Sequence, residues 1–109
     1  MYVIKRDGTQ VPFDKQKIIN AINKAFIEVD NKLYETDTAK DIADEIYSYC
    51  FIKNRNLDYT LGLEELFQKT ITVEEIQDMV EEYLMRSERP DVARAYIRYR
   101  YKKEIARNY

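Results

Sequence analysis

The sequence has no histidine and only one cysteine, Cys50, among its 109 residues. Histidine or a reactive thiol serves in most acid–base and nucleophilic sites, and the carboxylates here are not clustered as metal ligands would be. One cysteine can form neither an intramolecular disulfide nor a zinc ribbon. We therefore predict no catalytic and no metal site within this chain, and we interpret Cys50 as a small buried residue of a helix.

Glycine is also scarce, because the chain contains only Gly8 and Gly62. A Walker loop or a G-x-G-x-x-G turn needs several glycines so that backbone N–H groups can surround a phosphate, and neither motif is present. Any triphosphate would therefore have to be held by side chains and helix ends.

Long apolar runs are missing as well. No stretch is long and uncharged enough to span a membrane, and the first residues do not form a basic and then apolar signal segment. We expect a cytoplasmic chain without a membrane partner. The net charge of −2 gives no general reason to expect nucleic acid binding either.

What the chain does contain is sufficient for one modest core, since 45% of its residues are hydrophobic. We predict a single domain over residues 1–109. Charged residues make up 35% of the chain and are unevenly placed. Residues 94–107 hold six cations and one carboxylate, Glu104, so the remainder of the chain is acidic.

The start of the chain predicts a β-hairpin over residues 1–13. Two alternating apolar runs flank Asp7-Gly8, and Asp-Gly is favoured in a type I′ turn because glycine adopts positive φ without a Cβ clash. Alternation along the first strand places Val3 and Lys5 on one face, opposite to the neighbouring arginine.

A period of 3.6 residues predicts helices after the hairpin. The predicted helices span 14–30, 37–52, 72–86 and 90–107, and a long connection occupies 53–71. Asp14 and Thr72 are placed as N-caps, and Pro90 stands near the first position of the last helix, where its missing N–H costs nothing.

The last helix has two different sides. Tyr96 and Lys103 fall on its inner side, whereas Arg94, Arg98 and Lys102 recur every four residues as a basic ridge. The outer face of the 72–86 helix is acidic. Both surfaces are interpreted as solvated helix faces or as interaction surfaces.

Three cations gather early in the chain. Lys5 and Arg6 lie at the hairpin turn, and Lys17 follows in the first turn of a helix, where backbone N–H groups and a helix dipole favour an anion. This arrangement predicts a phosphate site. The alternative is an exposed hairpin edge that cations protect from aggregation, together with a solvated lysine beside a helix start.

The same residues carry a resemblance to a known family. The motifs Val-x-Lys-Arg-Asp-Gly from Val3, Val-Pro-Phe-Asp from Val11 and Lys-Ile-x-x-Ala-Ile from Lys17 resemble the opening of the ATP-cone. This is a small nucleotide-binding regulatory domain at the front of many ribonucleotide reductases. Residues 73–78 and 92–100 resemble its third and fourth helices, in the version typical of the anaerobic, glycyl-radical enzymes, so the likeness covers nearly the whole chain.

The resemblance implies a function and partners. ATP and dATP would compete for one site as allosteric effectors, together with Mg²⁺, and would control an anaerobic ribonucleoside-triphosphate reductase. The chain would not itself reduce nucleotides. Its partners would be the catalytic domain of the reductase and other ATP-cones in a nucleotide-dependent oligomer.

The resemblance also assigns site residues. The phosphate-contacting cations are Lys5, Arg6, Lys17 and Lys102. The apolar cleft for the adenine ring is formed by Val3, Phe13, Ile18 and Ile76, and ribose or polar contacts come from Asp14, Val73 and Gln77. Val11 stands where some members have a glutamate that reads the adenine amino group, and Gln77 replaces a histidine of some members, so base discrimination would rely on backbone groups.

We therefore expect an α+β fold in which an N-terminal hairpin, or a sheet of three short strands, caps a four-helix bundle. Two other functions remain open. A transcriptional repressor of reductase genes has the same cone but places a four-cysteine site before it, whereas the hairpin here starts at residue 2. A protein-interaction module would use the acidic and basic helices and would bind no nucleotide.

Overall fold

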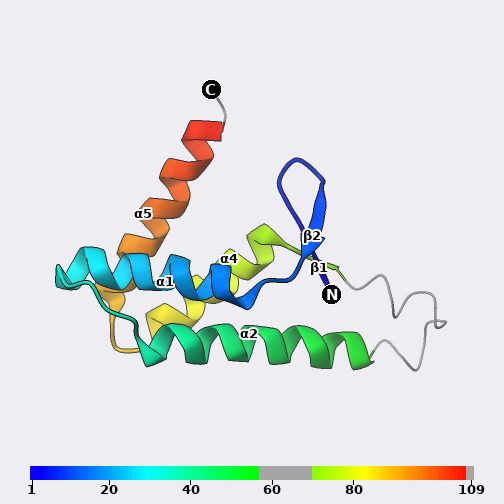
Figure 1. Cartoon of the computed structure of the whole chain (residues 1–109), viewed down its shortest axis with the longest axis horizontal. Helices are drawn as coiled ribbons and strands as arrows, with labels where there is room; N and C mark the ends of the chain where they lie inside the picture. Colours follow the sequence, from blue (N-terminus) through cyan, green and yellow to red (C-terminus); the bar gives the residue numbers. More distant parts are fainter. Residues whose placement is uncertain (57–69, 108–109) are drawn as a thin grey trace.

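The computed structural model describes residues 1–56 and 70–107 and confirms the α+β fold (Figure 1). Three short strands lie at one end of a bundle of four helices. The elements are β1 (Tyr2–Ile4), β2 (Gln10–Pro12), α1 (Lys15–Asp30), α2 (Asp37–Asn56), β3 (Thr70–Thr72), α4 (Val73–Arg86) and α5 (Pro90–Arg107).

The sheet has the order β2-β1-β3, with β1 in the centre. β1 is antiparallel to β2, with Val3 opposite Val11, and parallel to β3, with Val3 opposite Ile71. The third strand thus brings the start of α4 next to the start of the chain. Residues 70–71 had been included in the predicted connection, because three residues with one buried side chain, Ile71, are too few to reveal an alternating pattern.

The hairpin turn differs from the predicted type I′ turn. Gly8 N donates to Lys5 O at 2.9 Å and Lys5 N donates to Thr9 O at 2.8 Å, so three residues form the loop. Gly8 has φ +87°, whereas Asp7 is not among the residues of positive φ. The Asp7 carboxylate instead accepts hydrogen bonds from the backbone N–H and hydroxyl of Thr9. These bonds favour a loop with positive φ at glycine alone.

The predicted helix starts are confirmed in detail. Asp14 Oδ1 accepts a hydrogen bond from Gln16 N at 3.0 Å, and Thr72 Oγ1 accepts one from Glu75 N at 3.1 Å. Both side chains satisfy backbone donors that lack a partner within the helix. Pro90 occupies the first position of α5. Helix α1 ends at Asn31, which has φ 51°, a left-handed conformation that asparagine tolerates.

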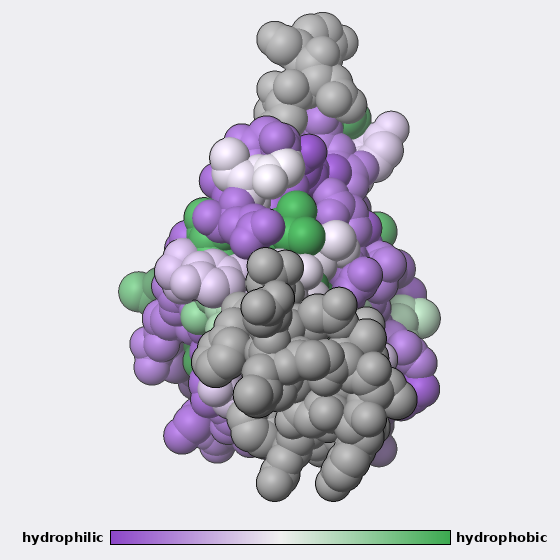
Figure 2. Space-filling view, turned by 90° about the vertical axis from the view of Figure 1, so that its right-hand side faces the viewer, coloured by the Kyte–Doolittle hydropathy of each residue, from purple (hydrophilic) through white to green (hydrophobic). Residues whose placement is uncertain are grey.

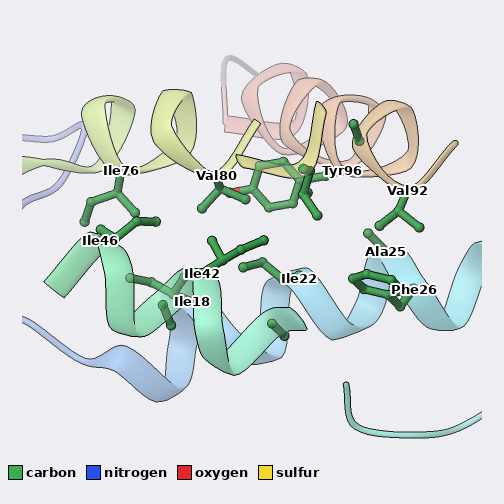
Figure 3. Close-up of a cluster of buried hydrophobic side chains, with 14 of the residues drawn as sticks. Ile18, Ile22, Ala25, Phe26, Ile42, Ile46, Ile76, Val80, Val92 and Tyr96 are labelled. Carbon is green, nitrogen blue, oxygen red and sulfur yellow. The ribbon is translucent and has the colours of Figure 1, made fainter. Parts of the chain in front are cut away.

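The core lies between the four helices. Helix α1 packs against α2 and α5, and α4 packs against the same two helices. Side chains from all four converge there: Ile18, Ile22, Ala25 and Phe26 of α1, Ile42 and Ile46 of α2, Ile76 and Val80 of α4, and Val92 and Tyr96 of α5 (Figure 3). The period of 3.6 had predicted these buried faces, because apolar residues recur along one stripe of each helix.

Helix α2 runs four residues further than the predicted end at 52, to Asn56. Cys50 is buried in this helix, as expected. The remainder of the predicted connection, 57–69, and its Gly62 lie outside the described residues. Within the described parts, no helix is both long and apolar enough to cross a membrane.

On the side of the molecule that carries the sheet, the surface outside the grey area is mainly hydrophilic, with small hydrophobic areas (Figure 2). The C-terminal half of α5 projects beyond the other helices on the same side as the β1–β2 loop (Figure 1). The outer side of α5 is basic and partly apolar. Arg94, Arg98 and Lys102 are exposed there, beside exposed Ile97 and Tyr101.

Candidate functional site

A cleft of about 210 Å³ opens where the sheet meets three helices. Its walls come from β1, β2 and the residues after β2, the first two turns of α1, the first turns of α4, and α5. The structure places all of the residues predicted for the base and ribose here: Val3, Val11, Phe13, Asp14, Ile18, Val73, Ile76 and Gln77. Two segments that are more than 50 residues apart in the sequence, 3–21 and 73–103, therefore form one site.

The floor of the cleft is apolar and well supported. Val3, Ile18 and Ile76 are at most 9% exposed and belong to the main core, so their positions are fixed by packing on both sides. Phe13 is half-buried, and its ring meets the ring of Tyr47 from α2 edge-on, with centroids 5.5 Å apart. An edge-to-face contact of this kind orients an aromatic side chain. The floor can therefore receive a flat apolar group.

Three lysines stand at the edge of the cleft: Lys5, Lys17 and Lys103. All three are exposed, and no carboxylate of the described residues lies within ion-pair distance of them. Lys17 lies in the first turn of α1, which contains no acidic residue. The interaction of a cation with the helix dipole is unfavourable near a helix N-terminus. A bound anion would offset this unfavourable interaction.

Asp14 is the one carboxylate among the described lining residues, and its side chain already caps α1 through the bond from Gln16 N. The Asp14 carbonyl also accepts from Lys17 N at 3.2 Å. Asp14 therefore contributes to the shape of the cleft as the residue that starts α1. A sugar hydroxyl is a suitable partner for its remaining acceptor capacity.

Arg6 behaves differently from the lysines, and it does not line the cleft. Its Nη2 lies 2.7 Å from Oε1 of Glu104 and donates to Oε1 of Gln77 at 3.0 Å, and its Nε lies 3.6 Å from Glu74. Arg6 thus connects the β1–β2 loop with α4 and α5. Among its partners in the described part of the chain, only Gln77 lines the cleft, so Arg6 lies next to the cleft and contacts its lining through Gln77.

Lys102, the fourth predicted phosphate ligand, is exposed on α5 but does not line the cleft, whereas its neighbour Lys103 does. Lys103 was not among the predicted site residues, although it lies seven residues after Tyr96, a second lining residue, and so falls on the same side of the helix. This spacing was the signal that could have identified it.

The pKa values of Tyr96 and Tyr99 are shifted by burial and by the nearby lysines. Burial raises the pKa of Tyr96, so its hydroxyl stays protonated in the cleft wall. For Tyr99, burial alone would raise the pKa, but hydrogen bonding and charge from Lys103 and Lys24 outweigh it and lower the pKa. The two ammonium groups lie 5.2 and 5.6 Å from the ring centroid. Positive potential therefore extends from the cleft along the seam between α1 and α5.

The side chains that line the cleft are suited to binding a ligand. An apolar floor beside several lysines that have no ion-pair partner among the described residues suits a ligand with an aromatic ring and a polyanionic tail. Among residues 1–56 and 70–107, no group of three or more metal-binding side chains occurs. The described residues that line the cleft include neither an activated nucleophile nor a paired acid and base.

Comparison with known proteins gives a consistent result. A family model described as the ATP cone domain matches residues 1–105. The anaerobic ribonucleoside-triphosphate reductase of Haemophilus influenzae is 40% identical over 108 residues, which are 96% of this chain and 13% of that protein. The vitamin B12-dependent ribonucleoside-diphosphate reductase of Thermoplasma acidophilum is 39% identical over 110 residues, covering 96% of this chain and 12% of the relative.

A third kind of reductase is similar to nearly the same degree. The ribonucleoside-diphosphate reductase subunit alpha of Treponema pallidum is 37% identical over 112 residues, 98% of this chain and 12% of its own length. The chain thus spans about an eighth of the curated relatives that it matches. The sequence motifs had suggested the version of the domain that is typical of anaerobic enzymes. Because the identities to all three kinds of reductase are similar, the likeness is not confined to the anaerobic ones.

Proposed function

This chain belongs to the ATP-cone family, and from that membership we propose that it is the allosteric nucleotide-binding domain of a ribonucleotide reductase. ATP and dATP compete for the cleft between the sheet and the starts of α1 and α4, and the bound nucleotide sets the overall activity of the reductase. The observation that carries the proposal is the combination of the apolar floor with Lys5, Lys17 and Lys103, which form no ion pair with a carboxylate of residues 1–56 and 70–107.

In the proposed complex the adenine ring lies on Val3, Ile18 and Ile76, with Phe13 at its side, and the triphosphate extends toward the lysines. Burial of a planar base supplies affinity, and the lysines supply charge-assisted contacts to phosphate. Ribose lies near Asp14, Val73 and Gln77, which surround the same cleft. Val11 cannot accept a hydrogen bond through its side chain, so backbone groups beside the cleft distinguish adenine from other bases.

Mg²⁺ enters this proposal together with the triphosphate. Mg²⁺ in nucleotide sites is held largely by phosphate oxygens and water, with few protein ligands. The described residues around the cleft fit this mode, because lysines and one capping carboxylate line it and no carboxylate cluster does.

We further propose that the partner is the catalytic domain of an anaerobic ribonucleoside-triphosphate reductase. The matches to such enzymes from Haemophilus influenzae, at 40% identity, and Escherichia coli, at 32%, support this class. The diphosphate reductases match almost as well, so the cone alone does not determine the class. A test of the class requires the sequence that surrounds the cone in its natural protein.

Association with other cones is also part of the proposal, with dATP favouring the larger assembly. The acidic face of α4 is partly neutralised within one chain, because Arg100 Nη1 lies 2.7 Å from Asp78 and 2.8 Å from Glu81. Contacts between cones would therefore involve the outer ridge of Arg94, Arg98 and Lys102. Sedimentation velocity with ATP and with dATP, well above their Kd, tests this, and one unchanged monomer under both conditions would contradict it.

Thermal unfolding with four triphosphates tests the nucleotide site. ATP and dATP should raise the melting temperature much more than GTP and CTP at equal concentration. At about 100-fold excess over Kd, the expected stabilisation is about 2.7 kcal/mol, which is easily measured. Equal stabilisation by all four triphosphates would show that the cleft recognises only the phosphates and not the base. If none of them stabilised the chain, the result would favour the protein-interaction module.

A further inference from the structure

Arg6 stands out among the cations near the cleft because it is already neutralised. Its Nη2 lies 2.7 Å from Glu104 Oε1, its Nε lies 3.6 Å from Glu74 Oε1, and Gln77 Oε1 accepts from Nη2 at 3.0 Å. These three partners come from the start of α4 and the end of α5. By contrast, Lys5, the preceding residue, has no carboxylate of the described chain within ion-pair distance.

The partner of Arg6 is chemically similar to the proposed ligand. A guanidinium donates through the same planar N–H groups to carboxylate and to phosphate oxygens, and phosphate carries more charge. Glu104 therefore takes up donor capacity that a phosphate could use. Gln77 ties this pair to the cleft, because it contacts Arg6 and also lines the cleft wall.

Glu104 can lose Arg6 without becoming an unpaired charge. Its Oε1 also lies 3.7 Å from Nε of Arg100, which is held in turn by Asp78 and Glu81. The side chains of Arg6 and Glu104 are 25% and 34% exposed, so water reaches both. An ion pair of this partly exposed kind is weak, and a ligand phosphate can displace it at small cost.

From these contacts we propose that Glu104 is an internal competitor of the nucleotide: it holds Arg6 in the free chain and yields Arg6 to the ligand's phosphate on binding. The inference rests on the proposed function and names a residue that sets the affinity of the same site. Exchange of Arg6 from Glu104 to phosphate also releases the tie between the β1–β2 loop and the last turns of α5. Nucleotide binding is thereby communicated to the C-terminal end of α5.

The test is a double-mutant cycle on ATP affinity, measured by calorimetry on this chain with Glu104→Gln, Arg6→Ala and both together. Glu104→Gln should tighten ATP binding about two- to fivefold, the range of a weak ion pair. The same substitution should have no effect when Arg6 is already alanine. Glu81→Gln is the matched control, because Glu81 contacts Arg100 but not Arg6, and it should leave affinity within twofold.

Two further ligands sharpen the experiment. Inorganic tripolyphosphate should show the same gain with Glu104→Gln as ATP does, whereas adenosine, which lacks phosphate, should show none. Melting temperatures of the free variants confirm that each is folded. If Arg6→Ala lowers the melting temperature strongly, Arg6→Gln replaces it in the cycle.

The outcomes separate the inference from the proposed function. An equal gain from Glu104→Gln with and without Arg6 would show only a general charge effect and would overturn the inference, as would unchanged or weaker binding by Glu104→Gln. In both cases the unmodified chain still binds ATP, and the proposed function stands. Absence of ATP binding by the unmodified chain would reject the proposed function and this inference with it.

Discussion

Arg89 Nη2 lies 2.5 Å from Oδ1 of Asp30, which joins the end of α1 to the start of α5. The same guanidinium contacts Asp91 through Nε at 3.1 Å, and it lies over the ring of Phe26, 5.4 Å from the centroid. Arg89 directly precedes α5, and its carbonyl accepts hydrogen bonds from the backbone N–H groups of Val92 and Ala93 in the first turn of that helix. One residue therefore fixes how two helices meet.

This contact predicts a specific acid sensitivity. The hydrogen bond from Arg89, with a second from Tyr34, lowers the pKa of Asp30 below 3.8, and Arg89 also lowers that of Asp91. A lowered pKa in the folded state gives stabilisation that is present above the unfolded pKa and is lost as pH falls through the folded one. Melting temperature should therefore fall as the pH is lowered below about 4.

Arg89→Ala should make that fall shallower, since both carboxylates then return toward their ordinary pKa. Thermal unfolding between about pH 7 and pH 2.5 measures the slope. The control is Arg86→Ala, which removes an exposed arginine bonded to Glu82 and leaves Asp30 and Asp91 untouched. An unchanged slope in Arg89→Ala would contradict the assignment.

Lys17→Ala should reduce ATP affinity about tenfold while leaving the free chain equally or slightly more stable. The loss reflects a charge-assisted phosphate contact of roughly 1.5–3 kcal/mol. Stability is preserved because a cation in the first turn of a helix opposes the helix dipole. Lys40→Ala, at an exposed site of α2 away from the cleft, is the control. A lower melting temperature with unchanged affinity would make Lys17 structural.

Lys102 and Lys103 form a matched pair of adjacent lysines. Lys103 lines the cleft and Lys102 does not, so Lys103→Ala should weaken ATP binding about tenfold and Lys102→Ala by less than about threefold. Calorimetry on the two variants compares them directly. A larger loss for Lys102→Ala would instead support the position implied by family resemblance.

Leu84→Ala should destabilise the fold by about 2–5 kcal/mol, because it leaves a cavity in a packed core. Leu84 is 0% exposed, whereas the adjacent Met85 is 57% exposed. Met85→Ala should therefore change stability by less than about 0.5 kcal/mol. Urea denaturation of both variants gives the free energies of unfolding, and similar losses would contradict the placement of this helix face.

Local patterns in the sequence determined the helices and most of the core. Ile22, Ile46 and Val80 are fully buried, as the 3.6-residue period predicted. Asp14 and Thr72 cap α1 and α4 because capping depends only on neighbouring residues. The motifs beginning at Val3 and Lys17 identified the family for the same reason, since they are read within short segments.

The tertiary structure decided what depends on distant segments. β3 forms because Ile71 pairs with Val3 of β1. A strand of three residues is too short to show the alternating pattern from which such a pairing could be predicted. Lys103 lines the cleft in place of Lys102 because each step along a helix turns by about 100°, so one residue changes the face presented. Arg6 meets Glu104 only after the chain has folded, because 98 positions separate two residues whose contact depends on how the hairpin and α5 are packed.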